Sequence, residues 1–317
     1  MLSSLHIRNF KCFEDLRIGS LARVNLITGK NNTGKTSLLE AVYTASGKNN
    51  WYPVLSTRGE DINNNLVERF DAFASLFFNR NILEEAFINE HALQLINNKT
   101  GKPYTLSESN NYFEHLDCEL RLLSDLDSGP CKLVGSAALQ MRELETLWDD
   151  AFFLTPYEDT ALQVLQQIEP DIEKIGLGKT PGGKRRFQVL LKGQKRPIPL
   201  MHLGEGMGRI LGILLSIVGG ENGILLIDEF ENGLHYSVQR QVWEAVFRLA
   251  QALDVQVFAT THSRDCVEAF AAAANQPGFG QDARLIRLYR NPQRQIREAN
   301  FDAETVQTAI ENQIELR

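Results

Sequence analysis

The sequence predicts an α/β fold with a mostly parallel β-sheet, and three stretches of the chain lead to this fold class. Residues 24–28 form a short β-rich run that enters a glycine-rich loop and then a helical stretch of apolar residues. Residues 224–227 are uniformly apolar and are followed by two carboxylates, and residues 255–259 form a further apolar run with a polar end. Uniformly apolar runs are typical of strands in a parallel sheet, because helices cover both faces of such a sheet.

Composition limits the class of protein. The chain has 317 residues, of which 43% are hydrophobic, as expected for a globular protein of one large or two ordinary domains. The net charge of −7 provides no general attraction to nucleic acid, so a DNA contact would need a local basic patch. Four scattered cysteines without a C-x-x-C pair are typical of reduced thiols. Residues 1–8 lack the apolar core of a signal peptide, and residues 210–220 are shorter than the ~20 residues of a membrane span. We expect a cytoplasmic protein without a membrane segment.

The N-terminal residues predict a small antiparallel subsheet ahead of the main sheet. Residues 5–13 alternate between apolar and polar side chains, which indicates a half-buried strand, and residues 16–18 are its predicted hairpin partner. With the strand at 24–28 and the loop after it, residues 1–47 form the first part of the predicted core.

The loop at residues 29–37 matches the phosphate-binding pattern G-x-x-x-x-G-K-[ST]. In this pattern backbone N–H groups and the lysine, Lys35, bind the β and γ phosphates, and the hydroxyl of Thr36 binds Mg²⁺. The following helix directs its N-terminus at the anion. An ordinary glycine-rich turn is the alternative, which the strand before and the helix after disfavour. The predicted ATP-binding residues of the loop are Asn31, Asn32, Thr33, Gly34, Lys35, Thr36 and Ser37.

Residues 48–150 are predicted to be a mainly helical insertion in this core. Residues 66–78 carry apolar side chains at helical spacing, while residues 112–123 fit either a strand or a short helix. The segment contains no catalytic motif. It also lacks sustained heptads, so a long coiled coil is not expected.

Residues 151–317 are predicted to complete the core. We expect a short strand at 152–154, a helix at 160–175, strands around tight turns at 178–196, an edge strand at 285–289 and a closing helix from Ala303. The turns at 178–196 carry the basic patch of the sequence: Lys184, Arg185, Arg186, Lys195 and Arg196. These cations are candidates for contact with DNA phosphates or an acidic partner. A solvated hairpin is favoured slightly, because aromatic side chains for base stacking are nearly absent.

The second half of the predicted phosphate site follows two of the apolar strands. Asp228 is the expected Mg²⁺ ligand, and Glu229 is placed to accept a proton from the attacking water. His262 follows the strand at 255–260 and can donate a hydrogen bond to a γ-phosphate. Glu229, Lys35 and His262 are therefore the predicted catalytic residues.

These motifs together resemble a known family. I-x-N-F-K-x-F at residues 7–13, the loop at 29–37, I-L-L-I-D-E-F-E-N-G-L-H at 224–235 and A-T-T-H-S at 259–263 are similar to motifs of ABC-type ATPases of the SMC, RecF and OLD group, most of all to OLD-like and stand-alone AAA-family forms. The resemblance covers about residues 1–46 and 198–270, and implies a P-loop NTPase fold of the ABC/SMC-head type. It places Lys11 near the nucleotide. Gln163 is a candidate for the family's Mg²⁺-sensing glutamine. We expect no C-terminal Toprim nuclease domain.

The family also has a signature segment, L-S-G-G-Q, and here the sequence departs from the pattern. Residues 203–210 read L-G-E-G-M-G-R-I, so that Gly204 replaces the signature serine and Gly206 is the matching glycine. Gly204 and Gly206 are candidate contacts to the ATP of a second copy through backbone N–H groups at a helix N-terminus. Arg209 is either a cation offered to that second copy or a surface residue of the helix.

By resemblance, the chain hydrolyses ATP with Mg²⁺ as a homodimer that closes head to tail. Assembly into a higher oligomer is an alternative to the dimer. Its expected role is DNA repair, DNA maintenance or defence against phage, with a separate effector protein for which a nuclease is one candidate. One alternative is a nucleotide-gated switch or scaffold with little turnover, which the missing signature serine favours. The other is the ATPase subunit of an ABC transporter, which the degenerate signature and the insertion disfavour.

Overall fold

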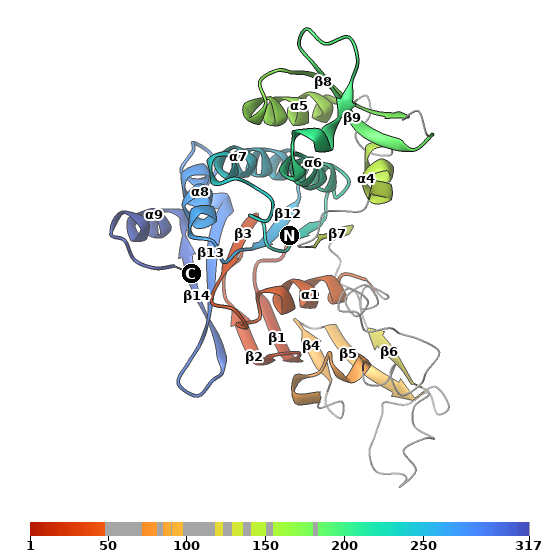
Figure 1. The fold of residues 1–317 in the computed structure, drawn as a ribbon. Helices are drawn as coiled ribbons and strands as arrows, with labels where there is room; N and C mark the ends of the chain where they lie inside the picture. Colours follow the sequence, from red (N-terminus) through yellow and green to blue (C-terminus); the bar gives the residue numbers. More distant parts are fainter. Residues whose placement is uncertain are drawn as a thin grey trace.

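The computed structural model describes residues 1–47, 72–80, 85–89, 91–97, 118–122, 129–135, 141–149, 155–179 and 183–316. At the centre of this part of the chain lies a six-stranded sheet in the order β14-β13-β3-β12-β11-β7 (Figure 1), and every neighbouring pair is parallel except β13 with β14. The predicted mostly parallel sheet is confirmed. Its strands are β3 (Val24–Thr28), β7 (Cys131–Val134), β11 (Ile224–Ile227), β12 (Gln256–Thr260), β13 (Ala283–Arg290) and β14 (Ile296–Asp302).

Helices cover both faces of this sheet. The helices α6 (Glu205–Val218), α7 (Tyr236–Ala252) and α8 (Arg264–Ala274) lie on one face, and α1 (Lys35–Ala45) lies on the other (Figure 1). Strand β11 shows how the sequence serves both layers. Leu225 and Ile227 pack in the core that contains α6 and α7, while Ile224 and Leu226 pack in the core that contains α1. This double burial explains why the strand is uniformly apolar.

A second, antiparallel sheet covers α1 from the outside, in the order β2-β1-β4-β5-β6. The hairpin of β1 (Leu5–Phe10) and β2 (Phe13–Ile18) is the predicted N-terminal subsheet, with Leu5 paired to Ile18 and Phe10 to Phe13. Side chains of β1 share a core with α1 and with Ile224 and Leu226 of β11. Helix α1 is therefore held between the two sheets.

The predicted insertion differs from the expectation in its described parts. They add β4 (Ala86–Ile88), β5 (His91–Asn97) and β6 (Cys118–Leu122) to the antiparallel sheet and β7 to the central sheet, while helix occurs at residues 72–74 and in α4 (Met141–Leu147). Short apolar runs fit a strand or a helix equally well. Here the edge of β1 pairs with β4, and β4 pairs with β5, so these segments form strands. Of the predicted segment 112–123, the structure describes residues 118–122, and these form strand β6, in agreement with the strand alternative. The limits of the insertion stay a prediction, because residues 48–50 and 150–151 lie outside the described residues.

A third sheet of β8 (Ile172–Lys179), β9 (Arg185–Leu191) and β10 (Ile198–Pro199) lies with α5 (Pro156–Ile168) above the layer of α6 and α7 (Figure 1). The strands predicted at 178–196 are confirmed. The helix predicted at 160–175 ends at Ile168 instead, because Pro170 disfavours a helical backbone at the residue before it. Residues 152–154, predicted as a strand, lie outside the described residues.

The C-terminal part closes the sheet. Strand β13 was predicted to be an edge strand, but it lies between β3 and β14. The sequence signal for β14 is weak, because most of its side chains are only partly buried and polar. The predicted closing helix is confirmed as α9 (Ala303–Glu311). In the described part of the chain, no helix is long and apolar enough to cross a membrane.

Candidate phosphate site

The phosphate-binding loop connects β3 to α1 as predicted. Gly29 and Gly34 have φ angles of +144° and +90°, which side-chain-bearing residues rarely adopt. A Cβ atom at Gly29 would lie 2.4 Å from the carbonyl oxygen of Leu288, and one at Gly34 would lie 2.7 Å from Cys12 Sγ. Both glycines are therefore required by the path of the loop. The loop leads directly into the N-terminus of α1, where free N–H groups attract an anion.

Lys35 lies at the start of α1 and turns back over the loop. Its Nζ donates hydrogen bonds to the carbonyl oxygens of Gly29 at 2.8 Å and Lys30 at 3.1 Å. Burial lowers the pKa of Lys35, while the carboxylates of Asp228, Glu231 and Glu229 oppose that shift. The ammonium group is thus near the loop and within the field of the acidic residues that follow β11.

The two predicted Mg²⁺ ligands lie side by side. The hydroxyl of Thr36 is 3.1 Å and 3.2 Å from the two carboxylate oxygens of Asp228, although the residues are 192 positions apart in the sequence. Hydroxyl and carboxylate oxygens are hard donors of the kind that Mg²⁺ prefers, and Mg²⁺ in nucleotide sites needs few protein ligands beside the phosphates. The donor set therefore fits Mg²⁺.

Glu229 lies beside Asp228 in an unusual backbone conformation. Its φ angle is +50°, in the left-handed region that non-glycine residues adopt at a cost. Its N–H donates to the hydroxyl of Thr260 at 2.8 Å, and the same hydroxyl donates to Asp228 at 2.6 Å. Sequence analysis did not single out Thr260. The available signal was its place at the end of a buried strand, next to the residues that were selected.

His262 is held by a residue that sequence analysis did not assign. The backbone N–H of His262 donates to Glu231 Oε1 at 3.1 Å, and His262 Nδ1 lies 3.3 Å from the same oxygen. The imidazole is 53% exposed, whereas the side chain of Glu231 is 12% exposed. The signal for Glu231 was present in the sequence, because a third carboxylate follows Asp228 and Glu229 within D-E-F-E.

These side chains surround one cavity of about 490 Å³. The residues that line it come from the phosphate loop, from the turn between β1 and β2, from residue 75 and from the ends of β11 and β12. They are Lys11, Cys12, Asn31, Asn32, Gly34, Lys35, Thr36, Ser37, Ser75, Asp228, Glu229, Thr260 and His262. The structure therefore brings together the three predicted catalytic residues and both predicted metal ligands.

Two family models match this chain. Residues 1–122 match a family described as "AAA ATPase domain", and residues 140–265 match one described as "AAA domain, putative AbiEii toxin, Type IV TA system". A Helicobacter pylori protein named "ATP/GTP phosphatase" is 23% identical over 354 residues, which cover 92% of this chain and 94% of that protein.

One solved structure supports the fold. An SMC head bound to the C-winged helix domain of ScpA is similar with a TM-score of 0.54 at 12% identity, and covers 96% of this chain and 99% of that chain. The SMC head domain from Thermotoga maritima gives 0.49 at 14% identity, over 95% and 98%. The chain is a P-loop ATPase with two parts similar to AAA ATPase domains and with the fold of an SMC head. The predicted fold class and the predicted ATPase activity are thereby supported.

The remaining predicted ATP contacts of this ATPase lie at the cavity in different ways. Asn31 and Asn32 are exposed, whereas Thr33 is 5% exposed and its hydroxyl donates to the Lys30 carbonyl at 2.8 Å. Lys11 lines the cavity, but its Nζ lies 2.8 Å from the Glu40 carboxylate in a buried ion pair. Any role of these residues in binding ATP stays a prediction.

The signature-like segment lies away from this cavity. Gly204 has a φ angle of +107° and α6 begins at Glu205, so free N–H groups are present at a helix N-terminus as predicted. None of the described residues that line the cavity belongs to residues 203–208. Both interpretations of Arg209 are wrong: it is 5% exposed and donates to backbone carbonyls of the same chain, including Asp228 at 2.8 Å. Gln163 is exposed on α5 and does not line the cavity.

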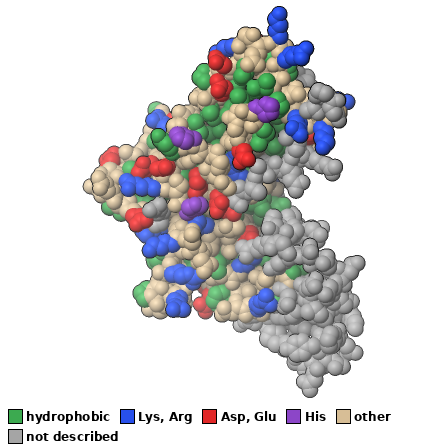
Figure 2. All heavy atoms as spheres, viewed as in Figure 1, with side chains coloured by type: hydrophobic (Ala, Val, Ile, Leu, Met, Phe, Trp, Pro, Cys, Tyr) green, Lys and Arg blue, Asp and Glu red, His purple; other side chains and the backbone are tan. Residues whose placement is uncertain are grey.

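The predicted basic patch lies on the lobe of α5, β8 and β9, where Figure 2 shows Lys and Arg side chains gathered at the top of the view. Arg185 is held by a two-pronged ion pair with Asp149, at 2.6 Å and 2.8 Å. An exposed pair of this kind engages the planar guanidinium of Arg185 and reduces its availability to DNA.

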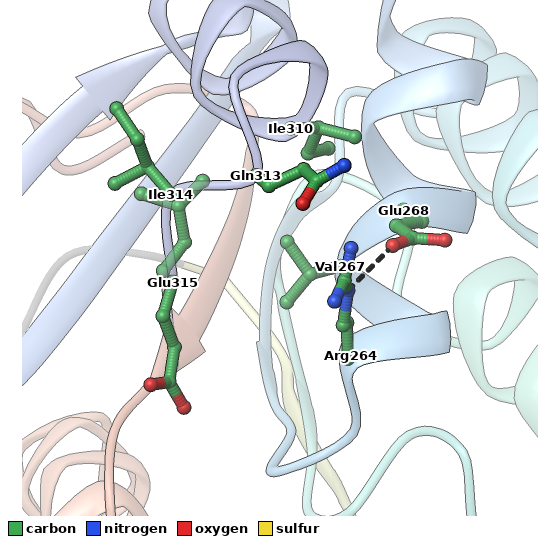
Figure 3. Close-up of a pocket in the computed structure, with 8 residues that line it drawn as sticks. Arg264, Val267, Glu268, Ile310, Gln313, Ile314 and Glu315 are labelled. Carbon is green, nitrogen blue, oxygen red and sulfur yellow. Dashed lines mark hydrogen bonds and ion pairs between the residues drawn. The ribbon is translucent and has the colours of Figure 1, made fainter.

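A smaller cavity of about 270 Å³ lies between α8 and the segment after α9 (Figure 3). Arg264 and Glu268 of α8 form an ion pair at its wall, opposite Ile314 and Glu315. The hydroxyl of Thr28, at the end of β3, donates to the Leu316 carbonyl at 2.7 Å. The chain after α9 is thus anchored next to the phosphate loop, but none of the predicted phosphate-site residues lines this cavity.

Proposed function

We propose that this ATPase depends on Mg²⁺ and closes head to tail as a dimer on ATP, in the cytoplasm. The cycle of dimer closure drives a function in defence against phage or in DNA repair and maintenance. A separate effector protein carries the effector activity. The observation that carries the proposal is the one-sided cavity. It is lined by the phosphate loop, Asp228, Glu229 and His262, while the described residues of the signature-like segment at 203–208 are absent from it. Such a cavity is suited to completion by the α6 N-terminus of a second copy.

The hydrolytic roles follow from chemistry and position. Lys35 and the loop N–H groups stabilise charge on the phosphates, and Thr36 and Asp228 would hold Mg²⁺. When bound, Mg²⁺ neutralises charge that develops on the transferred phosphoryl group. Glu229 accepts a proton from the attacking water or orients it, and His262 donates a hydrogen bond to the γ-phosphate. Catalysis is therefore mainly positioning and electrostatic stabilisation.

The biological role draws on the comparisons. The name of the Helicobacter pylori relative supports nucleotide hydrolysis, and the family description with "AbiEii toxin, Type IV TA system" supports defence ahead of DNA repair. The SMC head that is bound to a ScpA domain supports a protein partner for a head of this fold. If DNA is also bound, Arg186, Lys195 and Arg196 of the basic patch are better placed than Arg185, which is engaged by Asp149.

The test combines light scattering with phosphate release for wild type and Glu229→Gln, each with and without ATP and Mg²⁺. We expect the variant to lose turnover by about a hundredfold or more, and to accumulate an ATP-bound particle of twice the monomer mass. Glu244→Gln, on helix α7 and not among the residues that line the cavity, is the matched control and should behave as wild type. If neither size nor turnover responds to Glu229→Gln, the switch or scaffold function replaces this proposal.

A further inference from the structure

Arg209 of α6 joins the ends of two neighbouring strands. Its Nη1 donates to the carbonyl oxygen of Gly135, which follows β7. Its Nη2 donates to the carbonyl oxygens of Asp228 at 2.8 Å and Glu229 at 3.2 Å, directly after β11. A guanidinium group has five N–H donors in one plane, so a single arginine can bind several converging carbonyl groups.

This buried charge lies in an acidic surrounding. Burial lowers the pKa of Arg209, and the carboxylates of Asp228, Glu229 and Glu231 oppose that shift. A cation that is 5% exposed is tolerated when its charged group is hydrogen-bonded, as both Nη groups of Arg209 are to these carbonyls. Arg209 does not line the phosphate cavity, so any effect it has on hydrolysis must pass through another residue.

The residue through which it can act is Glu229. A non-glycine residue stays at a φ angle of +50° only when surrounding groups fix its backbone. The hydroxyl of Thr260 binds the N–H of Glu229, and Arg209 binds its carbonyl oxygen, which also accepts from the N–H of Asn232 at 3.0 Å. Two side chains from two different elements therefore hold the Glu229 backbone from both ends.

We propose that Arg209 is a positioning residue for hydrolysis, which holds the backbone of Glu229 and so sets the direction of its carboxylate relative to Lys35 and Thr36. This inference rests on the proposed role of Glu229. It adds a consequence for the dimer, because α6 carries both Arg209 and the signature-like segment at its N-terminus. Any shift of α6 when two copies close would be transmitted to Glu229 of the same chain.

The test is a double-mutant cycle. Arg209→Gln and Arg209→Lys are made in wild type and in Glu229→Gln, and single-turnover hydrolysis is measured beside the affinity for a fluorescent ATP analogue. We expect Arg209→Gln to slow hydrolysis by about tenfold to a hundredfold, while the affinity changes by less than about threefold. Arg209→Lys should be intermediate, because an ammonium group reaches fewer carbonyls. In the Glu229→Gln background, Arg209→Gln should cause no further loss.

The control is Arg23→Gln. Arg23 also donates to a backbone carbonyl, that of Ala250 at 3.2 Å, but far from the cavity, so its loss should leave the hydrolysis rate unchanged. If Arg209→Gln does not fold, as judged by circular dichroism, Arg209→Lys carries the same cycle. Equal losses in both backgrounds, a joint loss of ATP affinity, or an unchanged rate would each overturn the inference. If Glu229→Gln alone keeps full turnover, the proposed function itself fails and the inference fails with it.

Discussion

The hydroxyl of Thr260 lies 2.6 Å from the carboxylate of Asp228 and connects the ends of the parallel strands β12 and β11. Because a hydroxyl can donate and accept at once, Thr260 also accepts the N–H of Glu229 at 2.8 Å. One buried side chain thus orients the predicted Mg²⁺ ligand and the backbone of the predicted base.

Replacing Thr260 by valine keeps its shape and removes this hydroxyl. We expect the Mg²⁺ concentration for half-maximal turnover to rise about tenfold, because Asp228 loses its orienting donor, and stability to fall by about 1–3 kcal/mol. Turnover is measured in a Mg²⁺ titration and stability by urea unfolding. Thr44→Val, a buried threonine near the end of α1, is the control and should leave the titration unchanged. An unaltered Mg²⁺ requirement in Thr260→Val would show that this hydroxyl does not position the metal ligand.

A second prediction concerns Glu231, which binds both the N–H and the imidazole of His262. Glu231→Ala should lower turnover about tenfold with ATP affinity retained, because His262 loses the group that orients it. Glu231→Gln should lie between, since an amide oxygen still accepts the N–H of His262. Steady-state kinetics in wild type and in His262→Ala test this prediction. A loss of the same size in both backgrounds would show that Glu231 acts independently of His262.

The buried ion pair of Lys11 with Glu40 gives a prediction about stability. The two side chains are 5% and 6% exposed and lie 2.8 Å apart. Lys11→Met should destabilise the fold by about 3–5 kcal/mol, because it leaves the Glu40 charge buried, and Lys11→Met/Glu40→Leu should cost less than the single change. Urea unfolding measures both. Arg264→Met breaks an exposed pair in α8 and should cost less than about 1 kcal/mol.

The same variants test the predicted contact of Lys11 with ATP. If Lys11 binds a phosphate, the double variant will recover stability but not ATP affinity. Recovery of both would restrict Lys11 to a structural role.

Thiol reactivity tests the packing of the core. Burial raises the pKa of Cys131 to about 11 and that of Cys266 to about 12. A raised pKa lowers the fraction of thiolate at any pH below it. At pH 8 both thiols should therefore react with iodoacetamide at least about a hundredfold more slowly than in denaturant. The rate should increase toward pH 11, as the Cys131 thiolate forms. Mass spectrometry of labelled peptides follows each site, and native rates equal to those in denaturant would contradict the described burial.

Sequence patterns predicted the parts of the fold that local chemistry determines. The phosphate loop, the apolar strand before Asp228 and the strand before His262 are each specified by residues that are adjacent in the chain. Thr260 and Glu231, which were missed, and Arg209, whose role was predicted wrongly, act through long-range contacts. The backbone groups that these side chains bind come near them only in the folded chain. They lie 31 positions away for Thr260, 31 for Glu231 and 20 for Arg209. The same reason explains why strands β4 and β5 were not predicted and why β6 was only one of two alternatives. All three extend the sheet from the edge of β1 and have no strong strand pattern in their own sequence.

The most direct test of the central claim, a site shared between two copies, is subunit complementation. Lys35→Ala removes the phosphate-binding lysine, and Gly204→Asp places a carboxylate at the α6 N-terminus, where no other atom lies within 4 Å of the added Cβ. Each variant should be inactive alone. Folding is checked by thermal melting, because Gly204 has a φ angle of +107° that an aspartate adopts only with strain. Mixed in equal amounts, they form dimers in which one of two sites is intact. The account predicts recovery of about a quarter of wild-type ATPase activity, because half of the dimers are mixed. Activity that stays absent at every mixing ratio, with both variants folded, would contradict a head-to-tail site.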